Sequence, residues 1–243
     1  MERTILYLDQ VDSTNTWVKQ NFAKLADGDA VWTQSQTAGR GRLGRSWQNL
    51  PGCGLFYTAV VRRDLAQPAC LPLYASVAAA RVLEKAAGVQ TMVKWPNDLL
   101  LGGKKLVGIL CEGVPGGWLC GIGFNLAHPQ AYFDQNDLPH GTSLLLQGIE
   151  AARQPEQLAR AMVEELNGQF GEGIAPFAEQ GFAAIREEYL ARCVNLGRPV
   201  EFDGGRGMAR DIDHEGRLVV DTEDGSQAVF TGEVSVRGIY GCV

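Results

Sequence analysis

Histidine is scarce in this chain of 243 residues, and its cysteines lack the short spacings that metal sites use. The three histidines, at positions 128, 140 and 214, lie far apart, and no two of the six cysteines form a C-x-x-C pair. A zinc site built on histidine and a Ser-His-Asp triad are therefore not expected. We predict that the cysteines (53, 70, 111, 120, 193 and 242) are small buried apolar residues in a reducing compartment.

Long apolar runs are also missing. The chain contains no stretch of about 18 apolar residues, which is the length needed to cross a membrane. The first residues, MERTILYLDQVDSTN, lack the apolar core and cleavage site of a signal peptide. Acids outnumber bases 28 to 22, and the resulting net charge of −6 argues against general affinity for nucleic acid. We expect a cytoplasmic protein with one large domain, or with a large domain and a small appendage.

The first two thirds of the chain alternate between strand and helix patterns. Residues 54–61 (GLFYTAVV) are rich in β-branched and aromatic residues and predict a strand. Residues 71–87 are rich in alanine and predict a buried helix. Further helices are predicted at residues 155–170, where Pro155 suits the first helical position, and at residues 182–193.

The segment TMVKWPNDLLLGGKKLVGILCEG predicts a hairpin. Residues 93–95 and 105–112 have strand character, and the Gly102-Gly103 pair between them is a strong turn signal. Pro96 cannot lie inside a central strand, so WPND is a bend. The next segment, WLCGIGFNLA, predicts another strand, and residues 127–141 predict a long loop.

From residue 197 onward the sequence changes to short strands with tight turns, which predicts a small β-barrel module. We place the domain boundary near Asn195. This tail holds five arginines against nine acids, a net charge of −4, so it is not expected to bind nucleic acid.

The seven residues GRGRLGR, from Gly39 to Arg45, fit the dinucleotide-binding pattern G-x-G-x-x-G. A dinucleotide loop must open a helix, because the pyrophosphate binds at that helix's N-terminus. Here RSWQNLPGCGLFYT follows and leads into a strand, so this interpretation is rejected. A solvated surface loop is one remaining explanation; the other is a loop that becomes ordered around an anion, for which arginine is the best-matched side chain.

Other polar residues leave two explanations open. Ser13-Thr14-Asn15 lies where a strand gives way to a helix, and it is either a helix cap or the polar end of a pocket. The strand lysines Lys94 and Lys105 are either solvated or positioned charges for an anionic group. On strict alternation, Lys105 shares a face with Val107 and Ile109.

Taken together, DSTN, QTAGRGRLGRSW, KWPNDLLLGGKKLVGIL and GIGFN, in this order, closely resemble the biotin–protein ligase family. The resemblance covers nearly the whole chain, including GRPVEF and GEVSVRG in the tail. It implies an α+β fold: a mixed-sheet catalytic domain of the class II synthetase or biotinyl/lipoyl ligase type in residues 1–194, and a small SH3-like β-barrel in residues 195–243.

The resemblance also implies an activity. Such enzymes activate biotin with Mg·ATP to biotinyl-5′-adenylate and then transfer biotin to a lysine of a biotin carboxyl carrier domain. The matching catalytic residues are Lys105, Arg40 and Arg42. Biotin binding is implied for Ser13, Thr14, Asn15, Gln36, Gly39, Arg40, Gly41, Arg42 and Lys105. ATP binding is implied for Arg42, Arg45, Trp47, Lys94 and Asn125.

Several points stay open. Asp98 is the candidate Mg²⁺ ligand because of its place in the bend. Only twelve residues precede Ser13, so we expect no DNA-binding winged helix of the kind that some family members carry. A lipoate or octanoate ligase and a non-catalytic biotin-binding protein are the alternatives. The sequence does not decide between a monomer and a homodimer.

Overall fold

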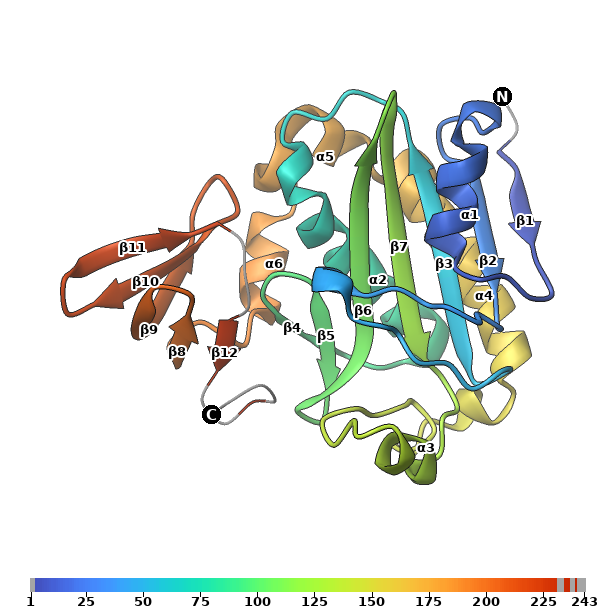
Figure 1. Cartoon of the computed structure of the whole chain (residues 1–243). Helices are drawn as coiled ribbons and strands as arrows, with labels where there is room; N and C mark the ends of the chain where they lie inside the picture. Colours follow the sequence, from blue (N-terminus) through green and yellow to red (C-terminus); the bar gives the residue numbers. More distant parts are fainter. Residues whose placement is uncertain (1–2, 231–233, 237–238, 240–243) are drawn as a thin grey trace.

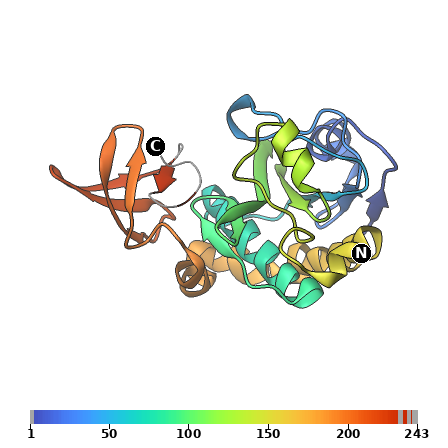
Figure 2. The same ribbon diagram turned by 90° about the horizontal axis from the view of Figure 1, so that it is seen from below.

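The computed structural model describes residues 3–230, 234–236 and 239. A large α/β body holds most of the chain, and a smaller β module lies beside it (Figures 1 and 2). The body is built on a seven-stranded sheet in the order β1-β2-β3-β7-β6-β5-β4. β1 pairs with β2 in parallel, and the other neighbours are antiparallel. The predicted mixed sheet is confirmed. Its strands are β1 (Ile5–Tyr7), β2 (Ala30–Thr33), β3 (Gly54–Val61), β4 (Met92–Lys94), β5 (Asp98–Leu101), β6 (Lys104–Val114) and β7 (Gly117–Asn125).

Helices cover both faces of this sheet (Figure 1). α2 (Leu71–Ala87) and α4 (Pro155–Gly168) pack against one face, and α1 (Thr14–Asn21) packs against β2, β3 and β7 on the other. All eight residues of β3 are buried, which explains its unbroken apolar run. The predicted helix at residues 71–87 is confirmed and ends where Gly88 adopts a left-handed conformation at φ 66°.

The Gly102-Gly103 turn of the predicted hairpin is confirmed, but the predicted pairing is wrong: the first strand of the hairpin is β5, which was not predicted, and β4 pairs with β5 and not with β6. Gly102 and Gly103, both at positive φ, join β5 to β6, and β5 also pairs with β4. Residues 95–97 form the predicted bend between β4 and β5. The predicted loop at residues 127–141 carries a short helix, α3 (Gln130–Gln135).

The helices after α4 also differ from the prediction. The helix expected over residues 182–193 is instead a 3-10 turn (Gly181–Ala184) followed by α6 (Arg186–Arg192), and it is preceded by α5 (Ala175–Gln180). Gly181 at φ 62° ends α5, which no helix-period pattern reveals.

The C-terminal module is a five-stranded antiparallel sheet in the order β11-β10-β9-β8-β12. The strands are β8 (Pro199–Phe202), β9 (Gly205–Ile212), β10 (Leu218–Thr222), β11 (Gly225–Val229) and β12 (Val234–Val236). In the GEVSVRG motif only residues 234–236 are described, and the prediction for Cys242 falls outside the described residues. Among the residues that the structure describes, no helix combines the length and the apolar character needed to cross a membrane.

Candidate active site

A cavity of about 500 Å³ opens between the sheet, the Gly-Arg loop and the bend at residues 95–97. It brings together thirteen of the fourteen residues singled out in the sequence. These are Ser13, Thr14, Asn15, Gln36, Arg40, Gly41, Arg42, Arg45, Trp47, Lys94, Asp98, Lys105 and Asn125. Gly39 is not among the lining residues. Its carbonyl accepts the backbone N–H of Trp47, and a Cβ there would lie 2.4 Å from the Trp47 carbonyl oxygen, so its place is in the turn.

One end of the cavity is a network of neutral hydrogen-bonding groups. Gln36 Oε1 accepts bonds from the backbone N–H of Thr14, at 2.8 Å, and from its hydroxyl, at 3.1 Å. The Thr58 hydroxyl lies 2.8 Å from Thr14 Oγ1 and 2.7 Å from Asn15 Oδ1. Ser13 begins α1 but makes no side-chain capping bond. The pocket-lining explanation of Ser13-Thr14-Asn15 therefore holds, and the plain-cap explanation fails.

A glycine allows this network to rest against the sheet. A Cβ at Gly121 would lie 2.0 Å from Asn15 Oδ1, so only glycine fits at that point of β7. Asn15 Nδ2 donates to the Leu110 carbonyl and to Glu112 Oε2, both at 3.1 Å. The first turn of α1 is thereby fixed to β6.

The Gly-Arg loop folds back on itself beside this network. The backbone N–H of Gly41 donates to the Arg45 carbonyl at 2.7 Å, which closes a tight turn around the exposed Leu43. Arg40 binds Glu112 through two parallel hydrogen bonds of 3.0 Å. Arg42 Nη1 donates to Asn97 Oδ1 at 2.6 Å. Arg40 and Arg42 therefore tie the loop to β6 and to the bend beside the cavity.

Lys105 reaches the cavity because of an irregularity in the sheet. The register of β5 with β6 shifts between Leu99 and Leu100, so Leu99 faces Val107 while Leu100 faces Lys105. Adjacent residues of β5 point to opposite faces, so Lys105 and Val107 do as well. The predicted shared face is wrong at this point. The shift places Lys105 Nζ 2.8 Å from Asp98 Oδ1 on the cavity side.

Trp47 lies flat against the sheet over two glycines. A Cβ at Gly108 would lie 2.2 Å from the Trp47 ring, and one at Gly123 would lie 3.2 Å from it. Lys105 Nζ is 5.4 Å from the ring centroid. The indole N–H is buried and has no hydrogen-bond partner among the described residues. The glycines of KLVGIL and GIGFN thus create the space that this ring occupies.

α3 and the loop around it form another wall of the cavity. Tyr132 and Phe133 line the cavity, and burial raises the pKa of the Tyr132 hydroxyl to about 12. His128 is fully buried behind them, with its ring centroid 4.4 Å from that of Tyr132, and burial lowers its pKa to about 4. At neutral pH the Tyr132 hydroxyl and the His128 ring are therefore both uncharged.

Three residues that hold predicted site residues in place were not themselves predicted from the sequence: Thr58, Asn97 and Glu112. Each of them holds a predicted residue, as described above. Asn97 and Glu112 lie in quoted motifs as polar residues beside apolar strands, a signal that could have flagged them. Thr58 inside an apolar strand gives no such signal.

Two protein-family models match this chain, one in the α/β body and one in the C-terminal module. Residues 7–125 match the model of the biotin/lipoate A/B protein ligase family, and residues 196–237 match that of the biotin protein ligase C-terminal domain. The chain is 32% identical to the biotin–[acetyl-CoA-carboxylase] ligase of Paracoccus denitrificans, over 95% of this chain and 100% of that protein. It is 30% identical to the bifunctional ligase/repressor BirA of Bacillus spizizenii, over 97% of this chain and 75% of that protein.

Solved structures show the same similarity. The biotin protein ligase of Aquifex aeolicus in complex with biotin and ATP superposes with a TM-score of 0.76 and 25% identity, covering 97% of this chain and 99% of that one. The Leishmania major biotin protein ligase in complex with biotin gives a TM-score of 0.64 at 25% identity, over 96% of this chain and 100% of that one.

Proposed function

This chain belongs to the biotin–protein ligase family, and from that premise we propose that it makes biotinyl-5′-adenylate and transfers biotin to a lysine of a biotin carboxyl carrier domain. It is a ligase enzyme. One observation carries the proposal: a single cavity has a neutral hydrogen-bonding end and a cationic end. The first end suits the biotin ring system, and the second suits the groups that react.

In the first step a carboxylate oxygen of biotin attacks the α-phosphorus of ATP, and the bond to pyrophosphate breaks. Two anions must approach each other, so the protein has to supply positive charge and positioning. Lys105, Arg42 and Lys94 line the cavity and supply that charge. No protein nucleophile is needed, in keeping with a sequence that offers no catalytic triad.

In the second step the amine of the carrier lysine attacks the acyl carbon, the bond from that carbon to the phosphate oxygen breaks, and AMP leaves. The mixed anhydride must survive until the carrier arrives, so water has to be kept out. The Gly-Arg loop, held by the Arg40–Glu112 and Arg42–Asn97 contacts, is the cover that we assign to this task.

Biotin is preferred over lipoate or octanoate because of the neutral end of the cavity. The ureido ring of biotin presents two N–H donors and a carbonyl acceptor, which need polar partners. Ser13, Thr14 and Gln36 line this end of the cavity and offer such partners, whereas an apolar tail would make no hydrogen bond with them. The retained Lys105 and arginine loop argue against a protein that only binds biotin.

A magnesium ion would enter with the nucleotide. No three His, Cys, Asp or Glu residues cluster as a metal site in the described part of the chain, while Asp98 and Asp137 line the cavity. This donor set fits Mg²⁺, which commonly binds one or two carboxylates, substrate phosphates and water. When bound, the ion would neutralise phosphate charge, and Asp98 is the residue that we propose to contact it.

The domain boundary remains part of the proposal, with residues 1–194 as the catalytic domain and residues 195–243 as the second domain. The C-terminal family match, at residues 196–237, supports it. We also assign the enzyme to the cytoplasm, where carrier domains would be its substrates.

Transfer to a carrier tests the complete reaction. The enzyme is incubated with biotin, Mg·ATP and a purified biotin carboxyl carrier domain, and the carrier is analysed by intact-mass spectrometry. We expect one biotinyl group on the carrier, and none on the same domain with its acceptor lysine changed to arginine. An unmodified carrier in both reactions would contradict the proposal.

A further inference from the structure

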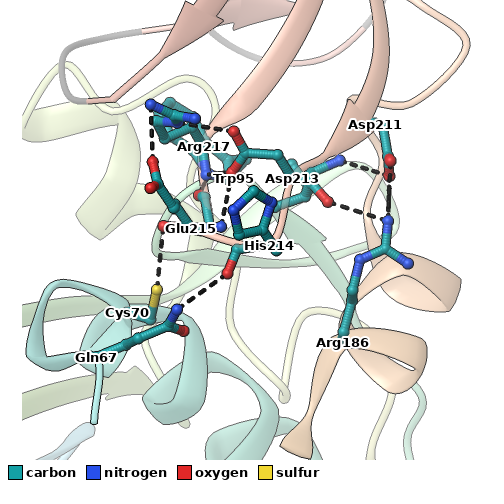
Figure 3. Close-up of polar contacts among 11 residues, drawn as sticks. Gln67, Cys70, Trp95, Arg186, Asp211, Asp213, His214, Glu215 and Arg217 are labelled. Carbon is teal, nitrogen blue, oxygen red and sulfur yellow. Dashed lines mark hydrogen bonds and ion pairs between the residues drawn. The ribbon is translucent and has the colours of Figure 1, made fainter. Parts of the chain in front are cut away.

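The turn between β9 and β10 attaches the C-terminal module to the catalytic body through three of its backbone carbonyls (Figure 3). Each carbonyl meets a side chain from the body. His214 O accepts from Gln67 Nε2 at 3.2 Å, Glu215 O accepts from Cys70 Sγ at 3.3 Å, and Gly216 O accepts from Trp95 Nε1 at 3.0 Å.

The turn is shaped before it docks. Asp213 Oδ1 accepts the backbone N–H groups of Glu215 and Arg217, both at 2.9 Å, and Asp213 Oδ2 accepts from Arg217 Nε at 2.7 Å. These bonds hold the pKa of the Asp213 carboxyl below its usual value, against the opposing effect of its partial burial. Gly216 has φ +78°, and a Cβ there would lie 2.7 Å from Cys70 Sγ. The close contact between the two parts of the chain therefore requires glycine.

A second ion pair holds the same face of the module. Arg186 on α6 binds both carboxylate oxygens of Asp211, at 2.8 and 2.9 Å, and also the carbonyl of Ile212 at 3.2 Å (Figure 3). The module is thus held to the body just before the docking turn as well as within it.

Trp95, which lines the cavity, donates the hydrogen bond to Gly216 of the docking turn. It is 2% exposed, and its indole N–H bond to Gly216 is buried. Its backbone N–H donates at 2.7 Å to the side-chain oxygen of Asn195, at the junction between the two parts. Two residues of the 195–243 segment therefore hold Trp95: Asn195 accepts from its backbone N–H, and Gly216 accepts from its indole N–H.

The residues that follow Trp95 hold the two central cations of the cavity. Asn97 binds Arg42, and Asp98 binds Lys105. Trp95 itself lines the cavity, as do Val234 and Ser235 of β12. A continuous series of contacts thus leads from the docking turn through Trp95 to the reacting end of the site.

We propose that Trp95 is a positioning residue that makes the placement of Arg42 and Lys105 depend on docking of the 213–217 turn. Its role in catalysis rests on the proposed function, but the structural coupling does not. When the turn is docked, the bend at residues 95–98 is held and Asn97 and Asp98 orient the cations. When the turn is released, the bend loses the Gly216 bond to the Trp95 indole and keeps only the Asn195 bond to the Trp95 backbone, while the neutral end of the cavity keeps its own network.

Two variants break the contact from opposite sides. Trp95→Phe removes the indole N–H and keeps a ring, and Gly216→Ala places a methyl group against Cys70. Trp118→Phe, on β7 and outside the interface, is the matched control. Hydrogen exchange of peptides covering residues 94–101 is measured in the full chain without substrates. We expect exchange at least about fivefold faster in both variants and unchanged in the control, with thermal unfolding confirming that each chain is folded.

The double variant distinguishes coupling from general loosening. Since both changes break one contact, the pair should raise exchange no further than the stronger single change. In the pyrophosphate assay we expect the rate constant of the burst, which reports adenylate formation, to fall at least about tenfold, with the biotin concentration for half-saturation within about twofold of the wild type.

Unchanged exchange at residues 94–101 in both folded variants, or fully additive effects, would overturn the coupling. Faster exchange with an unchanged burst rate would overturn the positioning role. Faster exchange in a protein whose wild type releases no pyrophosphate would leave the coupling standing and would count against the proposed function alone.

Discussion

Lys105 Nζ lies 2.8 Å from Asp98 Oδ1, between two neighbouring strands and beside the ring of Trp47. The Asp98 side chain is 15% exposed and the Lys105 side chain 30%, and both residues line the cavity, so the pair is partly shielded from solvent and faces the site. A fixed ammonium can stabilise charge on a carboxylate or phosphate without first being reorganised. We therefore place the reacting carboxylate and phosphate of the proposed reaction beside Lys105.

Removing that ammonium should stop adenylate formation while the fold survives. For Lys105→Ala we expect a loss of about 100- to 1,000-fold in the burst rate of biotin-dependent pyrophosphate release. Lys104→Ala is the control, because Lys104 is the exposed neighbour on the same strand, and it should keep normal turnover. Normal pyrophosphate release by the Lys105 variant would refute its role.

The cover over the cavity depends on Arg42 and its 2.6 Å bond to Asn97. In Arg42→Gly this contact is lost, and adenylate bound under the loop should dissociate about 10- to 100-fold faster, the effect of removing one charged hydrogen bond. Retention of labelled biotinyl-adenylate after gel filtration measures this. Arg153→Gly, at an exposed surface ion pair, should retain adenylate like the wild type. Tight retention by the Arg42 variant would count against the cover.

Gly108 should be needed for nucleotide binding. In Gly108→Ala the new methyl group would lie 2.2 Å from Trp47, so the ring must move. Since the family resemblance implies ATP binding for Trp47, we expect KM for ATP to rise about tenfold and KM for biotin to change less than twofold. Gly168→Ala, on an exposed helical position with nothing within 4 Å, is the control and should gain about 0.5–1 kcal/mol of stability. An unaltered KM for ATP would place the nucleotide elsewhere.

His128 should make stability depend on pH. Burial lowers its pKa from 6.5 to about 4, so between these values the unfolded chain binds the proton and the folded chain does not. Stability is then complete above pH 6.5 and falls as the pH drops toward 4. The loss reaches about 3 kcal/mol and does not grow further below that pH.

Urea unfolding at pH 4.5 and 7.5 tests this effect. His128→Phe keeps a ring against Tyr132 and should lose most of the pH dependence in this range. His214→Gln, at an exposed position, should keep it. Equal pH dependence in the wild type and the His128 variant would show that the buried ring is not responsible.

The regular elements could be predicted because their signals are local. The helix over residues 71–87 has no breaker before Gly88, and the Gly102-Gly103 turn needs only its two glycines. Strand β5 was missed because four residues between a proline and a glycine pair look like part of a turn. Its strand character comes from pairing with β4 and β6, which are distant contacts.

The site was predictable as a set of residues but not as a geometry. The motifs named thirteen of its lining residues, yet the face of Lys105 was assigned by strict alternation and was wrong. The register shift beside Leu99 reverses that face, and no periodicity in a single strand encodes it. Likewise, the partners Thr58 and Glu112 are set by how α1 and the loop pack on the sheet, which only the folded chain determines.

The most direct measurement is pyrophosphate release with Mg·ATP and no carrier, comparing biotin with lipoate and octanoate. We predict a biotin-dependent burst near one equivalent followed by slow turnover, because the adenylate forms and stays under the loop. A burst with lipoate or octanoate instead would assign the enzyme to a different acyl substrate. No release with any of the three acids would contradict the central claim that this cavity activates biotin.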